Sequence, residues 1–131
     1  MHVSKVHIAW LIAASAIFLV LGLLFAVSPS ATLERIGVET SDRLAGMIRV
    51  AGSVLLAEAA IVAVAVRSRE PIEIRLVTLL VVMHFTIETF VRVFSLAVGE
   101  SDNPVAAIPQ AVVAIGLALQ LRKMRQRSVS V

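Results

Sequence analysis

The stretch that decides the fold runs from Leu76 to Val98 and reads LVTLLVVMHFTIETFVRVFSLAV. A helix needs about 20 apolar residues to cross a hydrocarbon core about 30 Å thick, and this stretch is long enough. It also contains His84, Glu88 and Arg92, and ionisable residues inside a membrane segment generally mark a function. A helix advances about 100° per residue, which places these three side chains and that of Ser95 within an arc of roughly 80°. The stretch therefore predicts a membrane-spanning helix with one polar face.

The composition of the whole chain favours the same class of protein. Of the 131 residues, 59% are hydrophobic and 16% are charged, and the mean hydropathy is +0.95. Soluble domains carry about a quarter charged residues, so these values indicate an integral membrane protein. The absence of cysteine excludes disulfides, thiolate metal sites and cysteine nucleophiles. The basic residues cluster at the ends of apolar segments, without the basic and aromatic patch that nucleic-acid binding would require.

Four apolar segments predict an all-α protein, an integral membrane four-helix up-down bundle that forms one domain over residues 1–131. The predicted spans are residues 6–27, 44–66, 76–98 and 104–121. The first is expected to be a retained helix, because its apolar run is longer than that of a signal peptide and no A-x-A cleavage pattern follows. In the second, small residues should let helices approach closely. These residues are Gly46, Gly52, Ser53, Ala57 and Ala60.

The connections between the spans carry turn and capping signals. Ser30 is expected to cap a short surface helix that Gly37 ends. Residues 67–75 are predicted as a charged turn, and residues 122–127 as a basic tail. Pro109 should either kink the last span or delay its start, because proline lacks the backbone N–H that a helix interior needs.

The distribution of basic residues predicts the orientation. The amino end, residues 67–75 and the basic tail carry eight Lys and Arg residues, whereas the loops 28–43 and 99–103 carry only Arg35 and Arg43. Short loops rich in Lys and Arg stay on the cytoplasmic side. Both termini are therefore predicted to be cytoplasmic.

Polar residues of different spans lie at similar predicted depths. With a rise of 1.5 Å per residue, Arg49, Arg92 and Gln110 lie about 9 to 10 Å from the outer ends of their spans, and Glu88 lies about 16 Å deep. A charge in hydrocarbon costs at least about 2.5 kcal/mol, so we expect Glu88 to pair with Arg92 or with Arg49. The predicted polar cluster consists of Arg49, Ser53, Glu58, His84, Glu88, Arg92 and Gln110.

This cluster has a functional and a structural interpretation. It could form a pocket in which His84 and the glutamates pass protons or hold a cationic or hydroxylated ligand. It could instead lock the helices in register. His84 and Glu88 also have the spacing of metal ligands on a helix, but Glu58 is the one candidate for a third ligand, so no metal site is predicted.

Short motifs along the chain resemble those of a bacterial family. Residues 28–29 (SP) lead to residues 36–38 (IGV) and then to residues 49–52 (RVAG), and residues 92–95 (RVFS) precede Gly99. This pattern is similar to that of a family of small uncharacterised four-helix membrane proteins of bacteria and, more widely, to DoxX-like proteins. The resemblance covers nearly the whole chain. It implies a four-helix membrane fold and no established activity.

A second resemblance concerns residues 84–88 (HFTIE), which are similar to the histidine-to-glutamate helix of emopamil-binding sterol isomerases. In that family the pair moves protons on a sterol within a membrane cavity. The resemblance implies His84 and Glu88 as proton carriers, and Glu58 as a candidate for the further acid.

The sequence thus supports three alternative functions. The first is a non-enzymatic protein of the bacterial cytoplasmic membrane, acting as an accessory or small lipophile-binding protein. The second is a proton-transferring isomerase acting on a hydrophobic, sterol-like substrate through His84 and Glu88. The third is an oligomeric proton-coupled transporter, because four helices seldom enclose a full pathway alone. The expected partners are the lipid bilayer, a lipid-like small molecule and further copies of the chain, with no cofactor and no nucleic acid.

Overall fold

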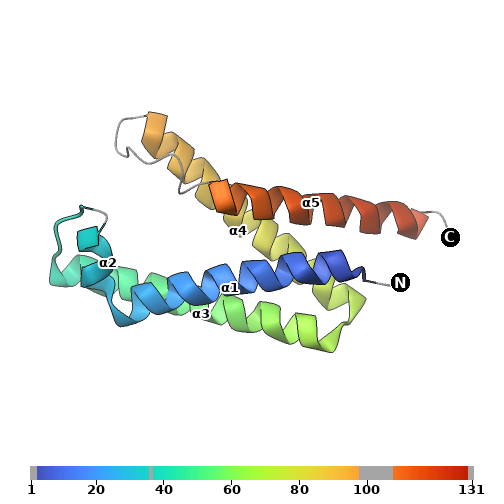
Figure 1. The fold of residues 1–131 in the computed structure, drawn as a ribbon, viewed down its shortest axis with the longest axis horizontal. Helices are drawn as coiled ribbons and strands as arrows, with labels where there is room; N and C mark the ends of the chain where they lie inside the picture. The colour runs from blue at the N-terminus through green and yellow to red at the C-terminus, as the bar shows by residue number, and fades with distance from the viewer. Residues whose placement is uncertain (1–2, 36, 98–107, 130–131) are drawn as a thin grey trace. The chain divides into compact units, whose positions relative to one another are not determined.

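The computed structural model describes residues 3–35, 37–97 and 108–129, and most of these residues are helical (Figure 1). The described helices are α1 (Lys5–Val27), α2 (Pro29–Arg35), α3 (Asp42–Ser68), α4 (Pro71–Ala97) and α5 (Ile108–Val129). The predicted all-α class is confirmed for this part of the chain.

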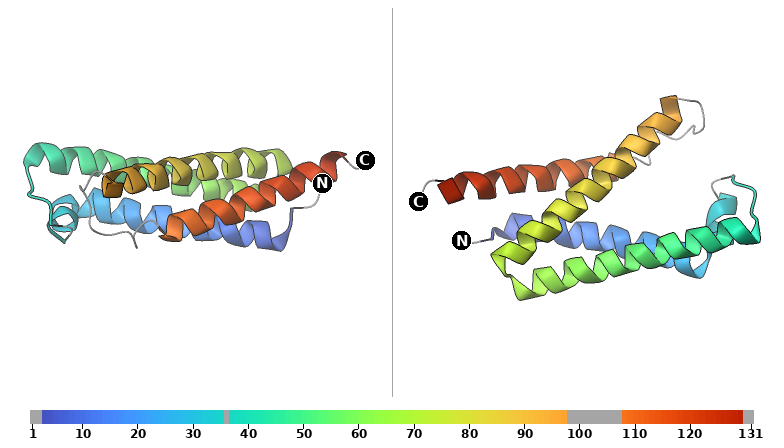
Figure 2. Two further views of the ribbon diagram at one scale, coloured as in Figure 1. Left: turned by 90° about the horizontal axis from the view of Figure 1, so that it is seen from above. Right: turned by 180° about the vertical axis from the view of Figure 1, so that it is seen from behind.

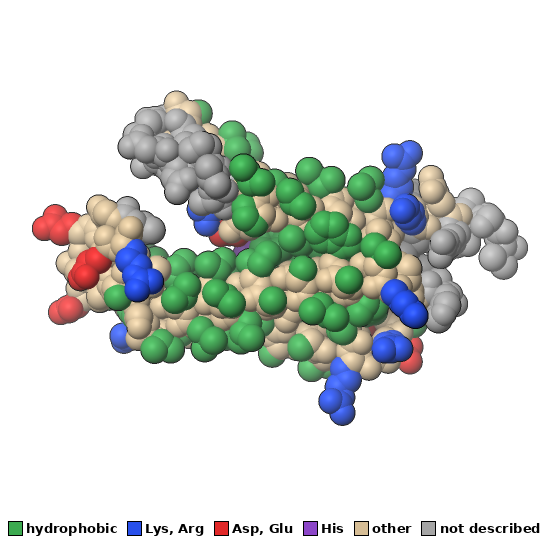
Figure 3. All heavy atoms as spheres, viewed as in Figure 1, with side chains coloured by type: hydrophobic (Ala, Val, Ile, Leu, Met, Phe, Trp, Pro, Cys, Tyr) green, Lys and Arg blue, Asp and Glu red, His purple; other side chains and the backbone are tan. Residues whose placement is uncertain are grey.

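Three of the described helices are long and apolar enough to cross a membrane. They are Lys5–Val27, Asp42–Ser68 and Pro71–Ser95, and only 22%, 22% and 28% of their most apolar windows is buried. Figure 3 shows hydrophobic side chains covering much of the helical surface. Apolar surface of this extent favours a lipid environment, because water would leave it unstabilised. The membrane class predicted from the sequence is therefore supported by three candidate spans.

The fourth predicted span, residues 104–121, is described from Ile108 onward. The described apolar part of this span, residues 108–121, ends before Arg122 and is about 21 Å long at 1.5 Å per residue. This is shorter than a hydrocarbon core of about 30 Å. The fourth crossing, the up-down topology and the cytoplasmic placement of both termini stay predictions.

The charged segment 67–75 is mostly helical, so the turn predicted there is wrong. α3 continues to Ser68 and α4 begins at Pro71, which leaves two residues between them. The Ser68 hydroxyl donates a hydrogen bond to the Glu73 carboxylate and accepts one from the backbone N–H of Glu70 at 3.3 Å. Pro71 suits a first helical turn, where no backbone N–H is needed. These contacts join the end of α3 to the start of α4 across the two-residue connection.

The basic tail predicted at residues 122–127 is helical, so the last helix continues beyond the end predicted for the fourth span at residue 121. α5 runs through this segment to Val129. Arg, Lys, Gln and Met are strong helix formers, so a basic composition does not end a helix. Pro109 is the second residue of α5 as described, in a first turn where proline is tolerated, and the choice between a kink and a delayed start stays a prediction. Residues 104–107 lie outside the described part of the chain.

The short surface helix is α2, and it ends as predicted. The backbone N–H groups of Gly37 and Val38 donate to carbonyls in the last turn of α2, each at 3.0 Å. Gly37 has φ of 76°, a left-handed conformation that suits glycine. The predicted cap, Ser30, lies inside the helix, because α2 begins one residue earlier at Pro29.

The chain divides into two compact parts, residues 12–64 and residues 1–11 with 65–131. The boundaries fall within α1 and within α3. Each part has its own buried residues and is described separately, and the predicted single domain stays a prediction.

In the part formed by residues 12–64, α1 and α3 lie side by side (Figure 2), and glycines at their contact let the two backbones approach closely. A Cβ atom added to Gly52 would lie 2.5 Å from the Ala26 backbone nitrogen, and one added to Gly22 would lie 3.0 Å from the Gly52 carbonyl oxygen. The Ser15 hydroxyl donates to the Ala59 carbonyl at 3.1 Å. Of the small residues predicted to allow close approach, Gly52 does so. Gly46 has no atom within 4 Å of an added Cβ, and Ser53, Ala57 and Ala60 are exposed.

In the part formed by residues 1–11 and 65–131, α4 packs against α5, and the start of α1 packs on both. His7 Nε2 lies 2.7 Å from Thr78 Oγ1, and both side chains are buried. The hydroxyl of Ser4, the residue before α1, donates to Gln120 Oε1 of α5 at 3.5 Å. The buried apolar side chains of α4 and α5 are Ile74, Val77, Val81, Phe85, Val113, Ala114 and Leu117.

Candidate functional site

The packed face of α4 changes from apolar to polar along the helix. Ile74, Val81 and Phe85 mark the buried side. Arg92 follows Ile74 by 18 residues, about five turns, and so points in the same direction, and Glu88 lies within about 40° of it. The side that packs apolar residues in the first half of α4 therefore presents ionisable residues in the second half.

The structure brings three of the predicted site residues together on this face, which we call the polar line: His84, Glu88 and Arg92. Glu88 lies in the middle. Its Oε2 is 3.8 Å from His84 Nε2, and its Oε1 is 3.4 Å from Arg92 Nη2. The side chains are half-buried, with exposed fractions of 24%, 32% and 39%. The carboxylate thus lies beside the guanidinium of the next turn and can neutralise its charge.

Both contacts of Glu88 are loose. The Arg92 hydrogen bond, at 3.4 Å, lies beyond the usual range of 2.7–3.2 Å, and 3.8 Å to His84 is too long for a hydrogen bond. A tight structural ion pair would show shorter, often bidentate contacts. The carboxylate therefore keeps the capacity to accept a further hydrogen bond.

Three buried polar atoms at this end of α4 and at the start of α5 have no hydrogen-bond partner within the described residues. They are Thr89 Oγ1, Arg92 Nε and Gln110 Oε1. A buried donor or acceptor without a partner costs about 1–3 kcal/mol, so native proteins keep few of them. Arg92 Nε is a hydrogen-bond donor, Gln110 Oε1 is an acceptor, and the Thr89 hydroxyl can be either. A bound group with a hydroxyl or a water molecule would satisfy them.

Gln110 belongs to the packed face of α5. Its side chain is 4% exposed, and Val113 and Leu117 follow it on the same face at spacings of three and seven residues. Leu121 of α5 and Leu76 of α4 line one cavity, and the two helices run in opposite directions (Figures 1 and 2). Counting eleven residues, about 16 Å, back from Leu121 along α5 leads to Gln110. Counting eleven residues forward from Leu76 along α4 leads to the residue before Glu88.

Gln110 is therefore level with the middle of the polar line. We call the combined set the α4–α5 polar cluster. It consists of His84, Glu88, Thr89, Arg92 and Gln110.

The other predicted site residues lie on α3, in the part formed by residues 12–64. Arg49 and Ser53 are exposed, and the Ser53 hydroxyl donates to the Arg49 carbonyl at 3.0 Å. Glu58 is half-buried. The predicted pair of Arg49 with Glu88 would join the two parts of the chain, so it stays a prediction, as does the predicted role of Glu58.

A metal site would need a further ligand beside the polar line. Within the described residues, no three His, Cys, Asp or Glu side chains come together in a way that could hold a metal ion.

Sequence reasoning missed the buried pair of His7 and Thr78. The Thr78 hydroxyl donates to the Ile74 carbonyl at 2.5 Å, so its oxygen accepts the hydrogen bond from His7 Nε2. His7 lies one position, and Thr78 two positions, inside the start of a predicted span. The comparison of depths that grouped Arg49, Arg92 and Gln110 could have found them.

Comparison of the chain with family models, curated proteins and solved structures finds no match. The resemblances to DoxX-like proteins and to emopamil-binding isomerases therefore stay predictions from short motifs, and the chemistry of the chain's own residues carries the functional inference.

Proposed function

We propose that this chain is a multi-pass protein of the bacterial cytoplasmic membrane that binds a small, hydroxyl-bearing lipophile at the α4–α5 polar cluster, as a non-enzymatic accessory protein. One observation supports this most directly. The donor at Arg92 Nε and the acceptor at Gln110 Oε1 are both buried without a partner in the described part of the chain. Each atom has lost its hydrogen bonds to water without gaining another, and a ligand that bonds to it would offset this free-energy cost.

A hydroxyl group matches these two atoms because it both accepts and donates a hydrogen bond. Its oxygen would accept from Arg92 Nε, and its proton would go to Gln110 Oε1. Thr89 Oγ1 offers a further contact to the same head group. The apolar remainder of the ligand would stay in the hydrocarbon, where it has no desolvation cost. A lipophile with one polar head is thus a better match than a soluble metabolite.

The loose contacts of Glu88 favour binding over a purely structural role. A cluster that served only to hold helices in register would gain from short, fully paired contacts. Interhelical polar contacts in membranes contribute only about 0.6 kcal/mol on average, which is a weak reason to retain five polar side chains. The isomerase and transporter hypotheses stay predictions from the sequence.

Photolabelling of the purified protein with a diazirine derivative of hexadecanol tests the proposal. We expect labelled peptides from the second half of α4 and the start of α5, and competition by hexadecanol but not by hexadecane. Gln110→Met, which keeps the side-chain length and removes the acceptor, should reduce labelling about tenfold, because one hydrogen bond in a dry site is worth about 1.4 kcal/mol.

The matched control is Gln120→Met, the same change near the other end of α5, where the side chain meets Ser4 instead. It should leave labelling unchanged. The stability of Gln110→Met should equal or exceed that of the unmodified protein, since the change removes a buried acceptor without a partner. Equal labelling by a diazirine alkane, or full labelling of Gln110→Met, would contradict the proposal.

A further inference from the structure

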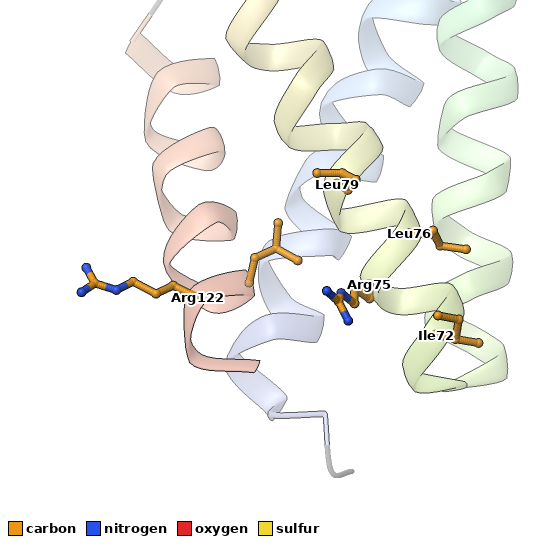
Figure 4. A pocket seen from close by; sticks show the side chains of 6 residues that line it. Ile72, Arg75, Leu76, Leu79 and Arg122 are labelled. Carbon is orange, nitrogen blue, oxygen red and sulfur yellow. The ribbon is translucent and has the colours of Figure 1, made fainter. Parts of the chain in front are cut away.

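The cavity that Leu76 and Leu121 line lies toward the opposite end of α4, about 20 Å from Glu88 along the helix. Its volume is about 510 Å³. The lining is apolar along one side and basic at one end (Figure 4). Its residues are Ile72, Arg75, Leu76 and Leu79 of α4 with Leu121 and Arg122 of α5. We call this cavity the basic groove.

The arginines of the basic groove carry uncompensated charge. Arg75 extends from α4 toward α5, whereas the guanidinium of Arg122 points away from α4 and the base of its side chain lines the groove (Figure 4). Both side chains are exposed, and neither forms an ion pair within the part of the chain that the structure describes. A guanidinium offers five donors in a planar arrangement that suits a phosphate.

The surroundings of the groove add further positive charge. The contacts of His7 with Thr78 and of Ser4 with Gln120 place the start of α1 at this end of α4 and α5. Figure 3 shows Lys and Arg side chains gathered where α5 ends. The described basic residues here are Lys5, Arg67, Arg69, Arg75, Arg122 and Lys123, against two acidic residues, Glu70 and Glu73. Of these two, Glu73 already accepts a hydrogen bond from Ser68.

The apolar side of the groove continues toward the hydrocarbon. Leu79 lies one turn beyond Arg75, about 6 Å deeper along α4. Leu76 and Leu79 are exposed by 59% and 49%, so their side chains are open to an occupant. A phospholipid carries a phosphate at the head-group level and acyl chains below it. The groove offers a matching arrangement, with a cation for the phosphate and aliphatic side chains for an acyl chain.

We propose that the basic groove binds an anionic phospholipid, with the phosphodiester on Arg75 and one acyl chain along Leu76, Leu79 and Leu121. A basic pocket between membrane helices is the type of site that anionic head groups occupy. The excess of basic over acidic side chains at this end favours a lipid with net negative charge over a zwitterionic one. This site does not depend on the lipophile site at the α4–α5 polar cluster.

Native mass spectrometry of the full chain, released from detergent micelles, measures this binding. The probes are phosphatidylglycerol, phosphatidylcholine with the same acyl chains, and inorganic phosphate. We expect phosphatidylglycerol to bind at least tenfold more tightly than phosphatidylcholine, and inorganic phosphate not to displace it. Equal affinity for the two lipids would overturn the proposal. Displacement of phosphatidylglycerol by inorganic phosphate would assign the groove to free phosphate and would also overturn it.

Two pairs of variants locate the site. Arg75→Gln should weaken phosphatidylglycerol binding about tenfold, as loss of a charge-assisted hydrogen bond predicts. Arg69→Gln, at the same end but outside the groove, should have a clearly smaller effect, and equal losses would indicate diffuse attraction and overturn the proposal. Leu79→Trp should block the groove without changing its charge, whereas Met83→Trp, one turn further and outside the lining, should not. All four side chains are exposed, so the variants should fold, which circular dichroism verifies.

Discussion

The imidazole of His7 and the hydroxyl of Thr78 meet at 2.7 Å across 71 positions of the chain. Their exposed fractions are 1% and 0%. Because the Thr78 proton goes to the Ile74 carbonyl, His7 donates through Nε2. This hydrogen bond joins the first turn of α1 to the second turn of α4 in a region that otherwise buries aliphatic side chains.

Thr78→Val should destabilise the protein. Valine keeps the shape of threonine and leaves the His7 donor buried without an acceptor, which should lower the free energy of unfolding by about 1–2 kcal/mol. Thr86→Val, an exposed position on the same helix, is the matched control and should change it by less than about 0.5 kcal/mol. Unfolding by sodium dodecyl sulfate in mixed micelles measures both variants. Equal stability of the two would show that the His7 contact contributes nothing.

Gly52→Ala should destabilise the contact between α1 and α3. The new methyl group would lie 2.5 Å from the Ala26 nitrogen, and because that atom belongs to the backbone the helices must separate. Overpacking of this kind costs about 1–3 kcal/mol. Gly46→Ala, in the same helix with open space around it, should instead be neutral or stabilising by up to about 1 kcal/mol through helix propensity. The same unfolding assay compares the two, and a loss at Gly46 as large as that at Gly52 would refute the close approach.

Glu88→Gln should lower the stability of the protein, because the polar line then lacks its one negative charge. Without the carboxylate, the Arg92 guanidinium has lost its counter-charge on α4, and the free energy of unfolding should fall by about 1–3 kcal/mol. The double variant Glu88→Gln with Arg92→Gln should recover most of this loss, because it removes the cation as well. Glu34→Gln, at an exposed position of α2, serves as the control. Additive losses in the double variant would mean that the two residues act independently.

Cysteine labelling should decide whether α5 crosses the membrane. The chain contains no cysteine, so single substitutions at exposed Glu39, Glu70 and Lys123 report their own positions. With an impermeant maleimide, we expect Glu39→Cys to react in intact cells, and Glu70→Cys and Lys123→Cys only after permeabilisation. Reaction of Lys123→Cys in intact cells would place the end of α5 outside and contradict the predicted topology.

The existence of the long helices could be predicted from sequence because hydropathy alone determines where a helix can enter a bilayer. Their ends could not. Residues 67–75 are charged enough to resemble a loop, yet most of them are helical, and the Ser68 and Glu73 side chains hydrogen-bond across the short connection. Residues 122–127 are basic but are also strong helix formers, so α5 continues through them.

Some contacts of the candidate site could likewise be predicted from the sequence, and others could not. The contacts among His84, Glu88 and Arg92 follow from a spacing of four residues on one helix, which the sequence shows directly. The comparison of depths also predicted Gln110 at the level of Arg92, but that its side chain is buried where α5 packs on α4 follows only from the tertiary structure. The contact of His7 with Thr78 depends on tertiary packing for the same reason.

The α4–α5 polar cluster is most directly tested by an experimental structure of the protein in lipid nanodiscs prepared with hexadecanol. The proposed function predicts density for an elongated molecule whose oxygen lies about 3 Å from both Arg92 Nε and Gln110 Oε1. A cluster in which these two atoms hydrogen-bond to each other or to other side chains, with no molecule between α4 and α5, would contradict it.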